Sequence, residues 1–478
     1  MNVRILFGFL FLPLALLGQQ PTIEWVDILE GTGSCRSGAI QTEMPGRTVI
    51  IGTYFAVNDL DPGVGLLEFN AETYGQPFAM VVDSNGILDW AWANSNIATE
   101  LPIKLCVDVL SNVYFCGKMS AIGDIDPGSN EVLLDASNDA VAIKLTPDGE
   151  LEWATIIGAG LNTTPTAIAV DSAGFVYTTG RIGNNYADFD PGPDTVGLYV
   201  ADGHMFVHKL SPNQELVWVK QLITDEWTWA TGSRDMELYQ NEYLYLTGTF
   251  RDTTDFDPGP GTAILSSNGK EDVFAMKMNL DGELVWARSF GGTGINNISD
   301  LTDHVESLAV TADGKVIVVG SYSDTCDFDP GPDVDLRISQ GQTDMFILQL
   351  TEAGELDWVH TLGNTGYEHA EQVQLDSSGN IYVTGSVQDG VDLDPGTDEF
   401  MLPPFADSYT RFVLVLDVQG NFISAFGTDV RFLAIDLDNA GNLYGAGSFS
   451  DTVDFDPSPY SEHIVISTLW NDSTFSYS

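Results

Sequence analysis

The sequence of 478 residues has few basic side chains. It contains 18 Lys and Arg against 69 Asp and Glu, which gives a formal net charge of −51. A surface with this balance repels the phosphates of nucleic acids and the head groups of anionic lipids. We therefore expect no nucleic acid partner. The charge suits cations, basic proteins or solubility in salty surroundings.

Long apolar runs are also scarce, and the one that stands out extends from Ile5 to Leu17. It follows a single positive charge at Arg4 and precedes Gly18-Gln19-Gln20, a pattern typical of a secretory signal peptide. A helix of this length is too short to span a bilayer. The sequence therefore predicts a signal peptide over residues 1–18 and a mature chain over residues 19–478 that has no transmembrane helix. The expected location is extracytoplasmic, either secreted or at the cell surface.

Cysteine is rare, with four residues in the chain. Cys106 and Cys116 flank a predicted hairpin turn and could form a disulfide across it, whereas Cys35 and Cys326 fall in loops far apart in the sequence. The absence of any Cys-x-x-Cys spacing argues against a zinc or redox centre. The nucleophile elbow Gly-x-Ser-x-Gly, the motif His-Glu-x-x-His and the P-loop are missing too. These absences favour a protein that is not an enzyme.

What the sequence has is an internal repeat. The pattern Asp-apolar-Asp-Pro occurs seven times, at intervals of 65, 64, 67, 72, 65 and 62 residues. A glycine precedes the first aspartate of each copy by seven or eight positions, as Gly320 precedes Asp327. A fixed period of this length indicates a repeat architecture.

Each unit contains four strand-like segments. In the fifth copy they cover residues 306–310, 315–320, 344–350 and 355–359, joined pairwise by short turns that contain glycine. The fourth segment usually carries Leu-x-Trp, as in Leu356 and Trp358, and a spacing of two residues marks one face of a strand. We interpret these tryptophans as core residues packed between neighbouring sheets, not as a platform for sugars.

Four antiparallel strands per unit without helices predict an all-β, seven-bladed β-propeller. A row of separate small domains is the competing interpretation. The last unit lacks its fourth strand after the segment Ser473–Tyr477, while Ile23-Glu24-Trp25 carries the same pattern near the N-terminus. We therefore expect the N-terminal strand, over residues 21–29, to complete the last blade and close the ring.

Segments such as Phe274–Trp286 and Asp376–Gly385 resemble the bacterial seven-bladed propeller repeats called SBBP. The insert Asp-Phe-Asp-Pro-Gly-Pro is similar to those of secreted proteins from Bacteroidetes-type bacteria. The resemblance implies a propeller fold and an extracytoplasmic location, and it implies no established activity.

The repeated motif lies in the connection between the second and third strands, on the same face as the long connections between units. One interpretation is a tight turn that buries the apolar residue while the aspartates accept bonds from backbone amides. The other is calcium, which binds several carboxylate and carbonyl oxygens of a tight loop. The candidate calcium ligands are the paired aspartates of the seven copies: Asp59, Asp61, Asp124, Asp126, Asp188, Asp190, Asp255, Asp257, Asp327, Asp329, Asp392, Asp394, Asp454 and Asp456.

Two histidines, His304 and His369, recur at matching positions, each two residues before a glutamate, Glu306 or Glu371. We interpret each pair as a hydrogen-bonded feature of its own unit, with a catalytic base as the alternative. The sequence as a whole predicts a binding or scaffold module without catalytic residues or an organic cofactor, whose long-loop face contacts a protein, a glycan or a cation. The alternative is a glycan-active hydrolase or lyase using carboxylates near the central channel, in which polar residues from two or three adjacent blades would cluster.

Overall fold

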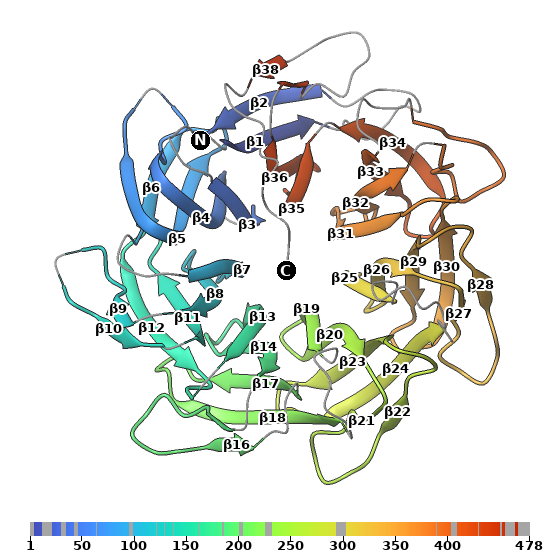
Figure 1. The fold of residues 1–478 in the computed structure, drawn as a ribbon, viewed down its shortest axis with the longest axis horizontal. Helices are drawn as coiled ribbons and strands as arrows, with labels where there is room; N and C mark the ends of the chain where they lie inside the picture. The colour runs from blue at the N-terminus through green and yellow to red at the C-terminus, as the bar shows by residue number, and fades with distance from the viewer. Residues whose placement is uncertain are drawn as a thin grey trace.

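The chain forms antiparallel sheets arranged as a ring around a central channel (Figure 1). The computed structural model describes residues 4–11, 22–29, 35–42, 46–63, 65–94, 99–120, 122–128, 130–136, 138–160, 162–183, 186–199, 204–224, 232–292, 303–388, 390–402, 409–428, 430–449, 452–454 and 464–466. The first strand of each sheet lies at the channel and the last at the outside, so the fold is an all-β propeller.

Six blades are each built from one stretch of chain, and each has four main strands that follow one another from the channel outward. Blade 1 contains β3 (Cys35–Gln41), β4 (Arg47–Asp59), β5 (Glu68–Asp83) and β6 (Leu88–Ala93). Blade 2 contains β7 (Thr99–Val107), β8 (Val113–Met119), β11 (Asp139–Leu145) and β12 (Leu151–Ile157). Blade 3 contains β13 (Thr163–Val170), β14 (Val176–Ile182), β17 (His204–Leu210) and β18 (Leu216–Thr224).

The next three blades repeat this order. Blade 4 contains β19 (Gly232–Tyr239), β20 (Tyr243–Phe250), β23 (Asp272–Asn279) and β24 (Leu284–Gly292). Blade 5 contains β25 (His304–Val310), β26 (Val316–Tyr322), β29 (Asp344–Leu350) and β30 (Leu356–Leu362). Blade 6 contains β31 (His369–Leu375), β32 (Ile381–Gln388), β33 (Tyr409–Leu416) and β34 (Phe422–Thr428).

The remaining sheet is a composite of both ends of the chain, and we call it the closing sheet. Its order is β35 (Arg431–Leu437), β36 (Leu443–Phe449), β1 (Arg4–Phe11) and β2 (Thr22–Ile28). The expected fold, seven blades closed by one N-terminal strand, is therefore wrong: six blades, not seven, are complete within one stretch of chain. The closing sheet takes two strands from the N-terminal segment, because the free edge of β36 pairs with β1 from Arg4↔Phe449 to Leu10↔Leu443.

The outer position of the closing sheet agrees with the sequence, since β2 covers the expected strand around Trp25. The third position is held by β1, where the sequence favoured Ser473–Tyr477, a segment that lies outside the described residues. The signal peptide expected over residues 1–18 stays a prediction.

The middle strands explain why the blades stack. Every residue of β26 and β29 is buried, and both strands are rich in Val, Ile, Leu and Phe. Strands covered by other sheets on both faces carry continuous apolar sequence instead of an alternating pattern. The core is therefore a series of apolar layers between neighbouring blades.

In several blades, a tryptophan of the outer strand packs against the next blade and forms a hydrogen bond with it. Trp286 is 7% exposed, and its indole Nε1 donates to the carbonyl of Glu352 in the following blade, at 3.0 Å. A Cβ on Gly354, whose φ is +75°, would lie 2.8 Å from that indole ring, so the turn needs glycine. Trp25 of β2 makes the same kind of bond to the carbonyl of Ser84, at 3.2 Å. The interpretation of these tryptophans as core residues is confirmed.

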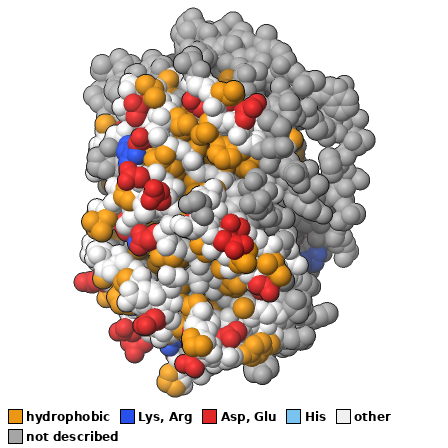
Figure 2. Space-filling view, turned by 90° about the vertical axis from the view of Figure 1, so that its left-hand side faces the viewer, with side chains coloured by type: hydrophobic (Ala, Val, Ile, Leu, Met, Phe, Trp, Pro, Cys, Tyr) orange, Lys and Arg blue, Asp and Glu red, His pale blue; other side chains and the backbone are white. Residues whose placement is uncertain are grey.

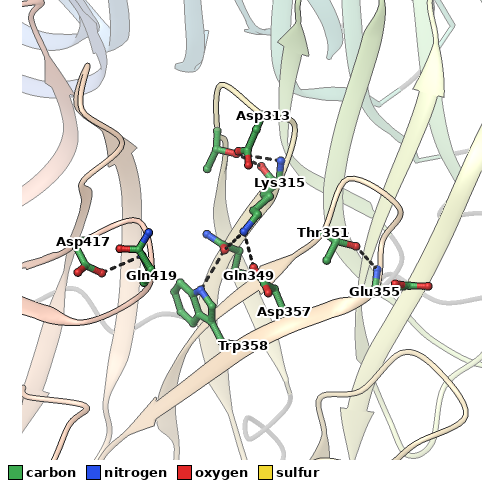
Figure 3. Close-up of polar contacts among 10 residues, drawn as sticks. Asp313, Lys315, Gln349, Thr351, Glu355, Asp357, Trp358, Asp417 and Gln419 are labelled. Carbon is green, nitrogen blue, oxygen red and sulfur yellow. Dashed lines mark hydrogen bonds and ion pairs between the residues drawn. The ribbon is translucent and has the colours of Figure 1, made fainter.

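Blade 5 has a variant of this contact (Figure 3). The indole of Trp358 donates to Oε1 of Gln349 within its own blade, at 3.1 Å, and Lys315 forms an ion pair with Asp357, at 2.7 Å. The ring still lies against a turn of the next blade, because a Cβ on Gly420 would be 3.1 Å from it. The packing between blades is therefore kept while the donor partner changes.

Five of the inserts that carry the repeated motif form small separate hairpins at the periphery, whereas in blade 1 the insert continues β4 and β5 and in blade 6 it holds a single bridge between Asp392 and Met401. The five hairpins are β9 (Ile122–Asp124) with β10 (Leu133–Asp135), β15 (Tyr186–Asp188) with β16 (Gly197–Tyr199), β21 (Thr253–Asp255) with β22 (Ile264–Ser266), β27 (Thr325–Asp327) with β28 (Leu336–Ile338), and β37 (Thr452–Asp454) with β38 (Ile464–Ile466). β21 pairs with β18 of the preceding blade and β27 pairs with β24. These inserts therefore cover part of an outer edge that would otherwise be open to pairing.

The cysteines do not form the disulfide that the sequence suggested. Cys106 lies opposite Tyr114, whereas Cys116 lies opposite Lys104, so the two thiols are offset along the hairpin. All four cysteines, which lie in described segments, are in the thiol form.

Candidate functional site

The Asp-apolar-Asp-Pro motif is a tight turn in the described copies. Oδ1 of Asp255 accepts the backbone N–H groups of Asp257, at 3.0 Å, and Ala263, at 2.9 Å. Oδ1 of Asp257 in turn accepts the N–H of Gly259, at 2.7 Å, and Phe256 between the two aspartates is fully buried. The same bonds recur at Asp59 and Asp61, Asp124 and Asp126, Asp188 and Asp190, Asp327 and Asp329, and Asp392 and Asp394.

These bonds support the structural interpretation of the motif, because one oxygen of each first aspartate is already bonded to two amides. Asp454 ends β37, and Asp456 lies outside the described residues. Within the described part of the chain, no group of three or more His, Cys, Asp or Glu side chains has the arrangement of a metal site. Calcium at these aspartates stays a prediction.

The innermost strand of the blades contains a β-bulge close to its start. Each bulge leaves one residue without a partner on the second strand, and bulges of this kind often redirect a side chain beside a functional site. The bulged residues are Gly38, Thr166, Arg234, Glu306, Glu371 and Leu433. Gly38 and Leu433 line the central cavity, which shows that this position faces the channel.

Charged residues occupy this position in blades 4, 5 and 6 only, as Arg234, Glu306 and Glu371. A second set lies two residues earlier in the sequence, where His304, His369 and Arg431 begin their strands. We call these six residues the mouth cluster. In a blade of alternating strand direction, the first strand begins at the face that also carries the connection between the second and third strands, so the cluster lies at the end of the channel on the side of the inserts.

The members of the mouth cluster interact with one another. Nη2 of Arg431 lies 3.0 Å from Oε1 of Glu371, which joins the closing sheet to blade 6. Nδ1 of His369 lies 3.1 Å from the hydroxyl of Ser321 in blade 5. Burial, together with the charge of Arg234 and the neighbouring His369, lowers the pKa of His304 to about 4, so this imidazole is neutral at physiological pH.

Glu306 lies at the centre of the mouth cluster. Its side chain reaches the solvent of the channel, yet the surrounding wall displaces enough water to raise the pKa of its carboxyl group above the ordinary value. Arg234 opposes this shift, and the negative charge of Glu371 adds to it. The two glutamates therefore have different environments, since Glu371 is paired directly with Arg431.

The channel below the mouth cluster contains a cavity of about 580 Å³ lined by the inner strands. Several of its carboxylates are bonded to the wall. Oε2 of Glu237 accepts the N–H of Val310, at 2.8 Å, and Oδ2 of Asp436 accepts both the N–H and the hydroxyl of Thr42, at 2.6 and 2.8 Å. Because these acids support the ring, the mouth cluster is the better candidate for recognition.

Part of this site was predicted from the sequence. His304, Glu306, His369 and Glu371 stood out as two equivalent pairs, but each pair was expected to act within its own blade. The structure brings both pairs together, and it adds Arg234 and Arg431, which no sequence pattern singled out. A bulge leaves no mark in an apolar pattern, so only the rarity of basic residues could have drawn attention to these arginines.

On the side that Figure 2 shows, acidic side chains are scattered between apolar and neutral ones, and basic side chains are few. The described residues include no helix with the length and apolar character needed to cross a membrane.

Comparison with known proteins agrees with the repeat and the fold. Residues 152–187 match the SBBP family model, described as a beta-propeller repeat. The chain is 26% identical over 231 residues to an uncharacterized WD repeat-containing protein, L264, of Acanthamoeba polyphaga mimivirus, and 32% identical over 130 residues to the regulatory protein FlaEY of Caulobacter vibrioides. The aligned regions cover 45% and 27% of this chain but 15% and 13% of those proteins.

Among solved structures, a protein of unknown function from Bacteroides caccae aligns with 76% of this chain and 94% of its own, at 11% identity and a TM-score of 0.33. That similarity is too low to support an argument. The repeated strands, the ring of sheets and the match over residues 152–187 together identify a β-propeller repeat protein.

Proposed function

We propose that this protein is a secreted or cell-surface binding module that holds a hydroxyl-rich ligand, a glycan, at the mouth cluster. The apolar run from Ile5 to Leu17 and the acidic composition support the location. The mouth cluster lies where the inner strands β25, β31 and β35 begin, next to the connections between blades, and loops on a rigid scaffold commonly carry binding sites.

The observation that carries this proposal is the asymmetry of the bulge position. Arg234, Glu306 and Glu371 follow one another in three adjacent blades, whereas the same position holds Gly38 in blade 1. A position needed only for folding would not require charge in some blades and none in others. Guanidinium groups donate and carboxylates accept, so the set can satisfy several hydroxyl groups at once.

A glycan array probed with the full chain tests the proposal. We expect a defined set of glycans to bind the wild-type protein, and the double variant Arg234→Ala, Glu371→Gln to lose at least tenfold in affinity. Arg337→Ala is the matched control, because this arginine lies in the peripheral strand β28, away from the channel, and pairs with the preceding Asp335. Equal binding by the double variant and the control would contradict the proposed site.

One observation favours a second candidate, a glycan-cleaving enzyme. Glu306 has a raised pKa, as a general acid requires, while the neighbouring Glu371 is paired with Arg431. Release of reducing ends from a bound glycan, abolished in Glu306→Gln with binding retained, would establish catalysis. Binding without turnover would leave the binding module as the function.

A further inference from the structure

We call the interface between two adjacent blades a seam. Two seams contain buried pairs of acidic residues that are not part of the mouth cluster. Asp272 begins β23 in blade 4, and Asp303 precedes β25 in blade 5. Asp344 begins β29 in blade 5, and Glu368 precedes β31 in blade 6. The exposed fractions of these residues are 0%, 5%, 2% and 0%. The same arrangement therefore occurs in two consecutive seams.

In the first seam, backbone N–H groups donate hydrogen bonds to some of the four carboxylate oxygens but not to all of them. The two oxygens of Asp303 accept the N–H groups of Gly292, at 3.0 Å, and Ser323, at 3.1 Å. Oδ2 of Asp272 accepts the N–H of Asn268, at 3.0 Å. The other oxygen, Oδ1 of Asp272, is buried and has no hydrogen-bond partner among the described residues, which do not include segment 293–302. A buried carboxylate oxygen without a donor is costly, and it points to a ligand that would satisfy it.

The second seam shows the same deficit. Oε2 of Glu368 accepts the N–H of Asn364, at 3.1 Å, and the backbone of Gln388 also stabilises the carboxylate, while Oε1 is buried and has no close hydrogen-bond partner among the described residues. Both oxygens of Asp344 lie 3.1 Å from the N–H of Gln340, and the backbone of Gly341 adds to their stabilisation. In each of the two seams, the described residues thus leave one buried carboxylate oxygen without a close donor.

Two glycines leave the space that the carboxyl groups of Asp272 and Asp344 occupy. A Cβ on Gly291 would lie 2.2 Å from Cγ of Asp272, and a Cβ on Gly363 would lie 2.4 Å from Cγ of Asp344. Each glycine sits at the end of the outer strand of the same blade. The backbone is therefore shaped around both carboxylates.

Each pair would hold two negative charges out of water. Burial raises the pKa of Asp303 to about 7, and the charge of Asp272 adds to the shift. Burial likewise raises the pKa of Glu368 to about 7, with a further contribution from Asp344. One proton neutralises only one member of a pair, whereas a divalent cation neutralises both.

Other seams show that the fold does not need these acids. Between blades 2 and 3, Thr163 takes the place of Asp303, and its hydroxyl group donates to the carbonyl of Ile157, at 3.0 Å, and accepts the N–H of Ala140, at 2.9 Å. Between blade 6 and the closing sheet, the two positions hold Thr410 and Val430. The paired acids are therefore specific to two seams.

We propose that each of these two seams binds one calcium ion, held by Asp272 and Asp303 in the first and by Asp344 and Glu368 in the second. Calcium takes six to eight oxygen ligands in flexible geometry, so backbone carbonyls and water can complete a shell that two carboxylates begin. The sites differ from the repeated Asp-apolar-Asp-Pro turns, and they do not depend on what the mouth cluster binds.

Calcium content of the full chain, residues 1–478, tests this proposal. After removal of metal with a chelator and dialysis against calcium chloride, we expect about two bound ions per chain. Asp303→Asn should remove one and Glu368→Gln the other. Asp329→Asn is the control and should keep both, because this partly exposed aspartate of an insert accepts the N–H of Gly331 and belongs to neither seam.

A measurement on the unaltered protein covers the case in which a variant fails to fold. Its melting temperature should rise with calcium and fall with chelator, and magnesium should give a smaller effect. A chelator-treated protein that stays folded and takes up no calcium would overturn the proposal. So would a calcium content that falls in Asp329→Asn but not in Asp303→Asn or Glu368→Gln.

Discussion

Nζ of Lys104 lies 2.8 Å from Oδ1 of Asp235, although the two residues belong to blades 2 and 4. The inner strand β13 of blade 3 contacts the inner strands of both blades, so the ion pair spans the channel side of a whole blade. Asp235 also accepts the hydroxyl of Ser307 in blade 5, at 3.0 Å. One aspartate thereby connects three blades at the channel.

Removal of this aspartate should destabilise the ring more than removal of its basic partner. In Asp235→Ala, Ser307 and Lys104 both lose an acceptor, and we expect a loss of about 3 kcal/mol in the free energy of unfolding. In Lys104→Met, Asp235 keeps its other donors and the lysine is partly exposed, so we expect about 1 kcal/mol. Urea denaturation compares the two variants, and a larger loss in Lys104→Met would contradict the assigned role.

The tryptophan contact between blades can be separated into packing and hydrogen bonding at Trp286. Trp286→Ala should cost about 3–5 kcal/mol, because a large cavity opens in the seam. Trp286→Phe keeps much of the apolar contact and loses the bond to the carbonyl of Glu352, so a smaller loss of about 1–2 kcal/mol is expected. Thermal unfolding measures both, and equal losses would show that the hydrogen bond dominates.

The repeated motif can be tested for a structural role at Asp255. Asp255→Ala should lower the free energy of unfolding by about 1–2 kcal/mol, because two backbone amides of the insert lose their acceptor. Asp255→Asn keeps an oxygen in the same place and should remain close to the wild type, even in the presence of a chelator. If Asp255→Asn instead abolished a calcium-dependent stabilisation, the ion-binding interpretation of the motif would gain support.

The buried acids make stability depend on pH in a defined direction. The folded pKa values of Asp303 and Glu368, both about 7, exceed their ordinary values of 3.8 and 4.5. Between these limits the folded state binds more protons than the unfolded state. The stabilisation is therefore complete below about pH 4 and is lost as pH rises through about 7.

Melting of the calcium-free protein between pH 4 and pH 8 measures this dependence. The charges of Asp272 and Asp324 also influence Asp303, so the informative quantity is the change in slope upon mutation. We expect Asp303→Asn to flatten the decline relative to the wild type. An unchanged slope would mean that this carboxyl group does not titrate in that range.

Much of the fold could be predicted from the sequence, because each copy of the repeat shows the same four strand-like segments in the same order. The pattern in the fifth copy located β25, β26, β29 and β30 to within two or three residues at each end. The burial of Trp286 followed from the Leu-x-Trp spacing. The closing sheet could not be predicted in full, since pairing of β1 with β36 depends on which extended segment reaches a free edge.

The candidate site was harder to predict than the fold. His304 and Glu306 look like a local pair in the sequence, and their relation to Glu371 and Arg431 depends on the curvature of the ring. Asp272 and Asp303 are separated in the sequence by β23, β24 and a connection, and nothing in either segment indicates that the charge of one acts on the other. Such sites depend on how neighbouring blades are placed, which a repeat period does not specify.

At the bulge of an inner strand, the side chain that faces the channel is independent of the hydrogen-bonded ladder that holds the blade together. Glycine, threonine, leucine, arginine and glutamate all occur at this unpaired position while the flanking ladder stays the same. A mutation at this position changes the side chain at the mouth of the channel without removing a paired residue from the sheet. The scaffold can therefore acquire a new specificity one blade at a time, and a protein engineer could exchange these few residues to redirect it.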